Sequence, residues 1–248
     1  EKRQQPMHVA GLQLFNFPED AGPRYIRDLV EHLRTFNEPQ HPFNKRLVRR
    51  FGQYFWETDQ QFDLEHHFRH RALPKPGRIR ELLSYVSAAH SNLMDRQRPL
   101  WEVHLIEGVQ GRRFALYTKV HHSLFDGISA MRMGSRALST DIDARDLPPI
   151  WAMPPRRKPT GLPNPIDVAT GAVRMTSGFS KQLATMPAVV KEIAKVARKS
   201  QRDPNFVPFM NAPASIINSD ITGSRRFAAQ SYPMERFKAI GKVFGCTL

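Results

Sequence analysis

Apolar and polar residues alternate along several short stretches before residue 123, and the period of this alternation separates expected strands from expected helices. A period of two predicts strands over residues 7–17, 47–56, 64–73, 101–107 and 113–122. Apolar positions at helical spacing predict helices over residues 24–36, 78–93 and 127–139. Gly108 and Gly111 lie between the last two strands and predict an antiparallel hairpin. Because strands and helices are interleaved, we expect an α/β fold with a mixed sheet and flanking helices.

Prolines interrupt this pattern after residue 147. Seven of the eighteen residues from Pro148 to Pro165 are proline, which predicts an extended connector. The stretch beyond it is compatible with helix and is divided by Pro187. We therefore expect four regions, which are an N-terminal domain over 1–147, a connector over 148–167, a basic helical segment over 168–203, and over 204–248 the start of a second, similar domain that is cut short. A fragment of this extent should be inactive, because its active site would be open on one side.

The composition is that of a globular protein and excludes several classes. The chain has 248 residues, of which 40% are hydrophobic, and no apolar run approaches the roughly 20 residues that a membrane-spanning helix needs. Its single cysteine, Cys246, excludes an intrachain disulfide and a multi-cysteine zinc site. The sequence shows no signal-peptide pattern. We therefore expect a cytoplasmic protein.

Positive charge is in excess and is unevenly distributed. The formal net charge is +14, and residues 154–203 contribute ten basic residues against three acidic ones, a net +7. Such an excess favours a polyanionic partner, which could be nucleic acid, an anionic lipid surface or a phosphorylated ligand. One interpretation is therefore a non-catalytic basic module that binds an anionic surface or nucleic acid. Nucleic acid is the weaker alternative, because basic strands interleaved with aromatic residues and a recognisable binding motif are both missing.

The segment that indicates chemistry most strongly is His121-His122-Ser123-Leu124-Phe125-Asp126-Gly127, at the expected junction of a strand and a helix. In a regular strand His121 and His122 point to opposite faces, and His122 shares its face with Phe114, Leu116 and Val120. A neutral imidazole is a suitable general base for a hydroxyl group. His122 is therefore the candidate base. We expect it to line a cleft, with His121 on the other side of the strand.

Asp126 has two interpretations from sequence alone. It could orient an imidazole as a catalytic partner, or it could cap the following helix by accepting a hydrogen bond from the backbone of Ile128 or Ser129. The capping role is the commoner one, and Gly127 suits a tight turn in either case. The histidine pair could also be half of a metal site. However, the remaining histidine cluster, His66-His67 with His70, is not brought near by any pattern, so no metal is expected.

The run from His121 to Ser129 resembles the HHxxxDG motif of the CoA-dependent acyltransferase superfamily. Three further segments narrow the resemblance, namely Met7-His8-Val9-Ala10, Pro99-Leu100-Trp101-Glu102 and the stretch from Asn218 to Phe227. With them, nearly the whole chain is similar to the bacterial wax ester synthase/diacylglycerol acyltransferase family. Ser219 departs from the glycine that often follows the asparagine in that family.

The resemblance implies an acyl-CoA-dependent O-acyltransferase. In such enzymes the second histidine, here His122, deprotonates the hydroxyl of a long-chain alcohol or diacylglycerol, which attacks the acyl-CoA thioester without an acyl-enzyme. His121, Asp126 and Gly127 would support the motif, with Asp126 pointing away to hold the loop. The resemblance implies acyl-CoA as co-substrate, no further cofactor and no metal. A donor for the oxyanion is not identified in the sequence.

Two groups of residues are candidates for substrate contact, and each has a structural alternative. Pro99, Leu100 and Trp101 could touch substrate or pack in the core. Asn218, Gly223, Arg225 and Arg226 could bind the phosphates of acyl-CoA or support the fold. We further expect the basic residues of 154–203 to make peripheral contact with an anionic surface, either the inner face of the cell membrane or a lipid droplet, and we expect no nucleic-acid partner.

Overall fold

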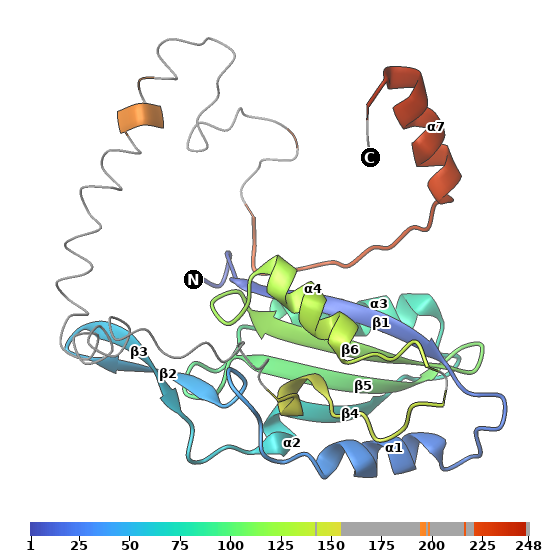
Figure 1. The fold of residues 1–248 in the computed structure, drawn as a ribbon, viewed down its shortest axis with the longest axis horizontal. Coiled ribbons are helices and arrows are strands. Elements are labelled where there is room, and N and C mark those ends of the chain that lie inside the picture. The colour runs from blue at the N-terminus through green and yellow to red at the C-terminus, as the bar shows by residue number, and fades with distance from the viewer. Residues whose placement is uncertain (142, 155–193, 197, 199–215, 217–220, 247–248) are drawn as a thin grey trace, which may run out of the picture. The chain divides into compact units, whose positions relative to one another are not determined.

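The structure of the protein is a computed structural model that describes residues 1–141, 143–154, 194–196, 198, 216 and 221–246. The chain divides into two compact units, Glu1–Pro155 with Ile221–Leu248, and Arg156–Asp220. Every helix and strand named below belongs to the first unit (Figure 1). Most of the expected connector and basic segment lies outside the described residues.

A four-stranded mixed sheet forms the centre of the first unit. Its strands lie in the order β1 (His8–Asn16), β6 (Arg113–His121), β5 (Trp101–Val109) and β4 (Phe68–Ala72). β5 and β6 form the expected hairpin, β1 pairs antiparallel with β6, and β4 pairs parallel with β5. The predicted mixed α/β fold is therefore confirmed.

Helices lie on both sides of this sheet, with α4 (Gly127–Arg136) in front and α3 (Ile79–Ser91) behind it in Figure 1. The side chains packed with α1 (Tyr25–Arg34) and α4 form one hydrophobic cluster, which we call the α1 face, and those packed with α3 form a second, the α3 face. Along β6, Phe114 and Val120 belong to the α1 face, whereas Ala115 and Tyr117 belong to the α3 face. The period-two alternation of the sequence thus produces the two faces.

The stretch 47–56, expected as one strand, is instead the middle of a hairpin. β2 (Lys45–Arg50) and β3 (Gln53–Thr58) pair antiparallel as a separate two-stranded sheet. The turn residues Phe51 and Gly52 have φ values of 51° and 77°. A type I′ turn requires positive φ at both central residues. Because the alternation of apolar and polar residues continues across this two-residue turn, the sequence pattern did not reveal the turn.

The stretch 64–73 is also only partly a strand. It begins with one helical turn, α2 (Leu64–His67), and continues as β4. Asp63 caps this turn, because its side chain accepts a hydrogen bond from the backbone N–H of Glu65 at 3.0 Å. The local cap therefore overrides the alternating pattern.

The proline-rich stretch begins as a packed segment. A short 3-10 helix, η1 (Ile150–Ala152), places Trp151 in the α1 face, where the side chain is 2% exposed. Its indole N–H donates to the carbonyl oxygen of Phe36 at 2.9 Å. Within 204–248, the described residues contain the helix α7 (Met234–Phe244). The division into a first domain, a connector, a basic segment and a second domain stays a prediction.

Candidate active site

The histidine pair lies where β6 ends, and backbone hydrogen bonds fix it on two sides. The N–H of His121 donates to the carbonyl oxygen of Leu100 at 2.9 Å, and the N–H of His122 donates to that of Met7 at 2.8 Å. Leu100 directly precedes β5, and Met7 directly precedes β1. Both neighbouring strands of the sheet therefore hold the backbone of the motif in place.

Both ring nitrogens of His121 contact neighbouring groups. Its Nδ1 accepts from the backbone N–H of Ser123 at 3.1 Å, and its Nε2 lies 3.4 Å from a carboxylate oxygen of Glu1. These contacts fit the neutral tautomer with the proton on Nε2. Burial lowers the pKa of His121, against the opposing effect of the nearby Glu1 carboxylate. The ring of His121 thus anchors the turn.

The side chain of His122, in contrast, is exposed. It follows the last residue of β6 and lines neither the pocket at the end of α3 nor a smaller one beside Leu64 and Phe68. The structure therefore gives the two histidines different environments. The assignment of His122 to a cleft, with His121 on the other side of the strand, stays a prediction.

Asp126 is the N-cap of α4. Its Oδ1 accepts from the backbone N–H of Ser129 at 2.6 Å, and the backbone N–H groups of Ser129 and Ile128 lower the pKa of its carboxyl. Gly127 is the first residue of the helix, has no positive φ, and would meet no atom within 4 Å if it carried a Cβ. The chain does turn from β6 into α4 within a few residues, but neither a positive φ nor a close contact requires glycine at this position, so its supporting role stays a prediction.

Pro99, Leu100 and Trp101 are buried in the fold. Trp101 is 1% exposed, and its indole N–H donates to the carbonyl oxygen of Phe43 at 2.8 Å. The carbonyl oxygen of Trp101 accepts from Nδ1 of His67 at 2.7 Å, while the two rings stack with centroids 4.5 Å apart. Together with the bond from His121 to Leu100, these contacts support the packing interpretation of the motif over direct substrate contact.

Of the second candidate group, Arg225 joins three segments of the chain. Its guanidinium donates to the carbonyl oxygens of Gln4, Thr222 and Ser224 at 2.8, 2.5 and 3.1 Å. Its backbone N–H donates to the hydroxyl of Ser91 at 2.9 Å. This supports the structural role of Arg225. Arg226 is exposed, and Asn218 lies outside the described residues.

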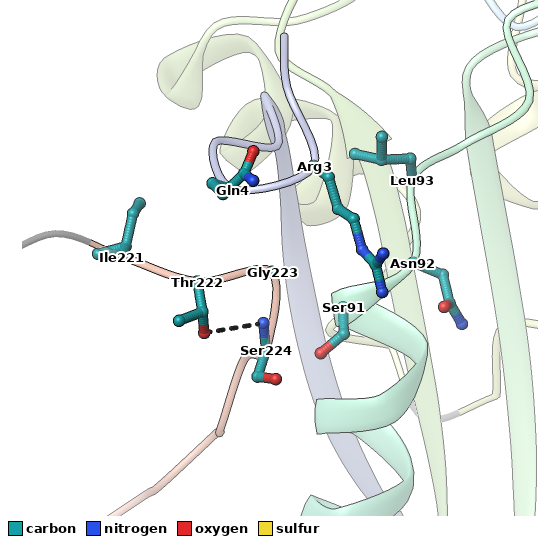
Figure 2. Close-up of a pocket in the computed structure, with 9 residues that line it drawn as sticks. All are labelled: Arg3, Gln4, Ser91, Asn92, Leu93, Ile221, Thr222, Gly223 and Ser224. Carbon is teal, nitrogen blue, oxygen red and sulfur yellow. Dashed lines mark hydrogen bonds between the residues drawn. The ribbon is translucent and has the colours of Figure 1, made fainter.

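Gly223 belongs to a pocket of about 750 Å³ beside the end of α3. A Cβ at Gly223 would lie 3.2 Å from Cγ of Arg3 and 3.3 Å from its carbonyl oxygen, so the close approach of the two segments favours glycine. Figure 2 shows the side chain of Arg3 reaching toward Asn92 between these segments. The pocket is lined by Arg3, Gln4, Ser91, Asn92, Leu93, Ile221, Thr222, Gly223 and Ser224.

Sequence reasoning missed a set of buried ionisable side chains on the α3 face. Lys119 is fully buried, and its ammonium donates to the carbonyl oxygens of Ala89 and Asn92 at 3.1 and 2.7 Å, at the end of α3. Burial lowers the pKa of this lysine. The one sign of it in the sequence is position, because Lys119 shares a strand face with Ala115 and Tyr117, which belong to the α3 face.

Glu102 and His104 on β5 belong to the same set. Nε2 of His104 donates to a carboxylate oxygen of Glu102 at 3.1 Å, and its Nδ1 lies 2.7 Å from the hydroxyl of Tyr85. Burial alone would raise the pKa of Glu102, but the bond from His104 and the charges of Lys119 and Arg69 lower it to about 2. The carboxylate is therefore ionised inside the fold and balances the buried ammonium.

The described residues contain no group of three or more histidine, cysteine or acidic side chains placed to hold a metal ion. His67 and His70, from the cluster weighed as a metal site, instead contact Trp101 and Glu107. Within the same part of the chain, no helix is long and apolar enough to span a membrane.

The fold, with the HHxxxDG turn at the end of an inner strand of a mixed sheet, is that of the CoA-dependent acyltransferases. The chain belongs to the wax ester synthase/diacylglycerol acyltransferase family, whose catalytic-domain model matches residues 1–248. This confirms the resemblance seen in the sequence.

Individual relatives agree with this placement. An O-acyltransferase of Acinetobacter baylyi is 44% identical over the whole chain, and a probable diacylglycerol O-acyltransferase of Mycobacterium tuberculosis is 38% identical. The solved structure of the wax ester synthase/diacylglycerol acyltransferase from Marinobacter aquaeolei VT8 is 50% identical, with a TM-score of 0.74 over 100% of this chain. The chain covers 53%, 54% and 53% of these three proteins, about half the length of each.

Proposed function

We propose that the protein transfers a fatty acyl group from acyl-CoA to the hydroxyl of a long-chain alcohol or a diacylglycerol, with His122 as general base. The observation that carries this proposal is the HHxxxDG turn in a chain that matches the family model over residues 1–248, with both ring nitrogens of His121 in contact with neighbouring groups and the side chain of His122 exposed. The alternative, a non-catalytic basic module, is supported by net charge alone.

In the proposed reaction, a neutral ring nitrogen of His122 accepts the hydroxyl proton while the hydroxyl oxygen bonds to the thioester carbonyl carbon. The carbonyl oxygen carries the negative charge of the resulting tetrahedral intermediate. The carbon–sulfur bond then breaks, and the imidazolium returns the proton to the CoA thiolate. The products are an ester, free CoA and neutral His122, and the proposed steps use no covalent enzyme intermediate, metal or further cofactor.

The contacts of the candidate residues make some of them better candidates for substrate binding than others. Arg226 is exposed and remains a candidate for CoA phosphates, whereas Arg225 already donates to three carbonyl oxygens. Pro99, Leu100 and Trp101 would act on the reaction by positioning His121 through the carbonyl oxygen of Leu100. We keep Asn218 and Gly223 as candidates near the CoA moiety.

We further propose that the protein works in the cytoplasm, peripherally attached to the inner face of the cell membrane or to lipid inclusions. The net charge of +7 over residues 154–203 supports contact with anionic lipid. Co-sedimentation that is strong with anionic vesicles, weak with neutral ones and reduced by salt is the expected result. Equal binding to both kinds of vesicle would contradict it.

The decisive experiment measures thiol release by the full-length protein from palmitoyl-CoA, with hexadecanol or a diacylglycerol as acceptor. His122→Ala should lower turnover by at least about 100-fold with an unchanged melting temperature, because the general base is removed. His32→Ala, outside the motif, is the matched control and should turn over like the parent. A folded His122→Ala variant that keeps its activity within a few-fold would overturn the proposal.

A second pair of variants separates the two roles of Asp126. Asp126→Ala removes the cap of α4 and should lower the melting temperature by roughly 2–4 °C, with a partial loss of activity. Asp126→Asn keeps a side-chain oxygen for the N–H of Ser129 and should resemble the parent. An inactive Asp126→Asn variant with an unchanged melting temperature would instead indicate a catalytic dyad.

A further inference from the structure

The hairpin of β2 and β3 presents aromatic side chains to solvent. It forms its own two-stranded sheet beside the central one (Figure 1). Phe51 at its tip is fully exposed at 104%, and exposed aromatic side chains follow it along β3, namely Tyr54, Phe55 and Trp56 at 58%, 46% and 42%. By the strand register, Tyr54 and Trp56 lie on one side of the hairpin and Phe55 lies on the other. The aromatic surface therefore surrounds the tip.

Fold stability does not account for Phe51. The residue has a φ of 51°, in the left-handed region that a bulky side chain rarely adopts. Asparagine before Gly52 would suit the type I′ turn better, because Asn-Gly is its preferred pair. An apolar ring at a strained and fully exposed position gains stability only from a surface that covers it.

The charges of the hairpin indicate which surface this is. Residues 45–58 carry four basic side chains against one acidic one, so their net charge is +3. Arg50 and Arg46 lie 2.6 and 3.9 Å from the carboxylate of Glu57, while the guanidinium of Arg49 lies 6.0 Å from the ring centre of Tyr54. Arginine among tryptophan and tyrosine is typical of the membrane interface, where each side chain has an apolar body and a polar end.

We propose that the tip of the β2–β3 hairpin inserts into the interface of an anionic lipid surface, with Phe51 entering the acyl region and Arg49 facing the phosphates. The inference rests on the proposed function for the presence of such a surface near the enzyme. The hairpin would then make the apolar part of the membrane contact, separately from the basic residues of 154–203.

Trp56 provides a direct reporter, because it is 42% exposed whereas Trp101 and Trp151 are 1% and 2% exposed. Tryptophan emission of the full-length protein is measured with vesicles of phosphatidylcholine, alone or mixed with phosphatidylglycerol, that contain brominated acyl chains. Quenching should occur with the anionic vesicles and should be lost in Trp56→Phe. The assay contains neither acyl-CoA nor alcohol, so its outcome does not depend on acyl transfer.

Phe51→Asn is the sharpest variant, because it removes the apolar ring and improves the turn. It should lower the vesicle partition coefficient about ten-fold, also at high salt, with a melting temperature equal to or above that of the parent. Arg49→Gln should lower binding about five-fold at low salt and little at high salt. Leu147→Asn replaces an apolar side chain outside the hairpin that is 42% exposed, and this control should bind like the parent.

Two results would overturn the inference. Phe51→Asn could bind vesicles as tightly as the parent at high salt, which would assign the apolar contact elsewhere. Alternatively, Trp56 could be insensitive to brominated lipid and already shielded in vesicle-free protein, which would mean that another part of the protein or a second copy covers the hairpin.

Discussion

The α1 face of the central sheet is an aromatic core, whereas the α3 face encloses ionisable side chains. On β5, Trp101 and Val103 belong to the α1 face, while Glu102 and His104 alternate with them toward α3. The two faces therefore depend on different forces. Non-directional burial stabilises the α1 face, which includes Leu124 and Phe125 of the histidine turn, whereas directional hydrogen bonds from Lys119 fix the end of α3 against β6.

The largest effect should come from the aromatic core. Trp101→Ala removes a side chain that is 1% exposed and should lower the free energy of unfolding by about 3–5 kcal/mol, because it leaves a cavity and an unpaired carbonyl of Phe43. Trp56→Ala, at a 42% exposed position, should cost about 1 kcal/mol or less. Denaturant unfolding of both variants measures the difference. Equal losses would mean that the α1 face is not the main source of stability.

The next effect concerns pH and a histidine in the aromatic core. Burial lowers the pKa of His67 from 6.5 to about 4, so the folded state holds this ring neutral. Its stabilising contribution is therefore complete above pH 6.5 and is lost as the pH falls through 4. The linked change is up to about 3 kcal/mol in the free energy of unfolding.

His67→Asn tests this, because asparagine keeps a donor for the carbonyl oxygen of Trp101 and does not titrate. Unfolding curves between pH 7 and pH 4 should be flatter for this variant than for the parent. His66→Asn is the control, since His66 is less buried. A pH dependence that is unchanged in His67→Asn would place the titrating groups elsewhere, including the α3 face.

Much of the first unit could be predicted because its signals are local. The β5–β6 hairpin, the flanking helices and the cap at Asp126 each depend on residues close in sequence. The turn at Phe51 and the helical turn before β4 were missed, because alternation continues through both. The role of Arg225 could not be predicted, since its guanidinium meets the carbonyl of Gln4, 221 residues away in the sequence.

The sequence motifs identified the family and pointed to a candidate site, but the contacts of the motif residues required the structure. For Trp101 and Leu100 the sequence favoured core packing but left substrate contact open, and their burial and hydrogen bonds support the packing interpretation. The burial of Lys119 was not predicted from the sequence, because a lysine in a strand is usually exposed. Only the structure shows that α3 packs against β6 and that carbonyl oxygens at its end accept hydrogen bonds from this ammonium group.

The smallest effect, and the most informative about the α3 face, should come from Lys119→Met. Methionine preserves the apolar stem but cannot donate to the carbonyl oxygens of Ala89 and Asn92. We expect a loss of about 1–3 kcal/mol in the free energy of unfolding and faster hydrogen exchange at the end of α3. Lys45→Met, which breaks a part-buried bond to Thr58, is the control and should change stability by about 0.5 kcal/mol or less. Replacement of a buried charge by an apolar residue can also stabilise a protein, since the desolvation cost disappears. A Lys119→Met variant at least as stable as the parent would therefore show that the desolvation cost of the buried ammonium exceeds the contribution of its two hydrogen bonds.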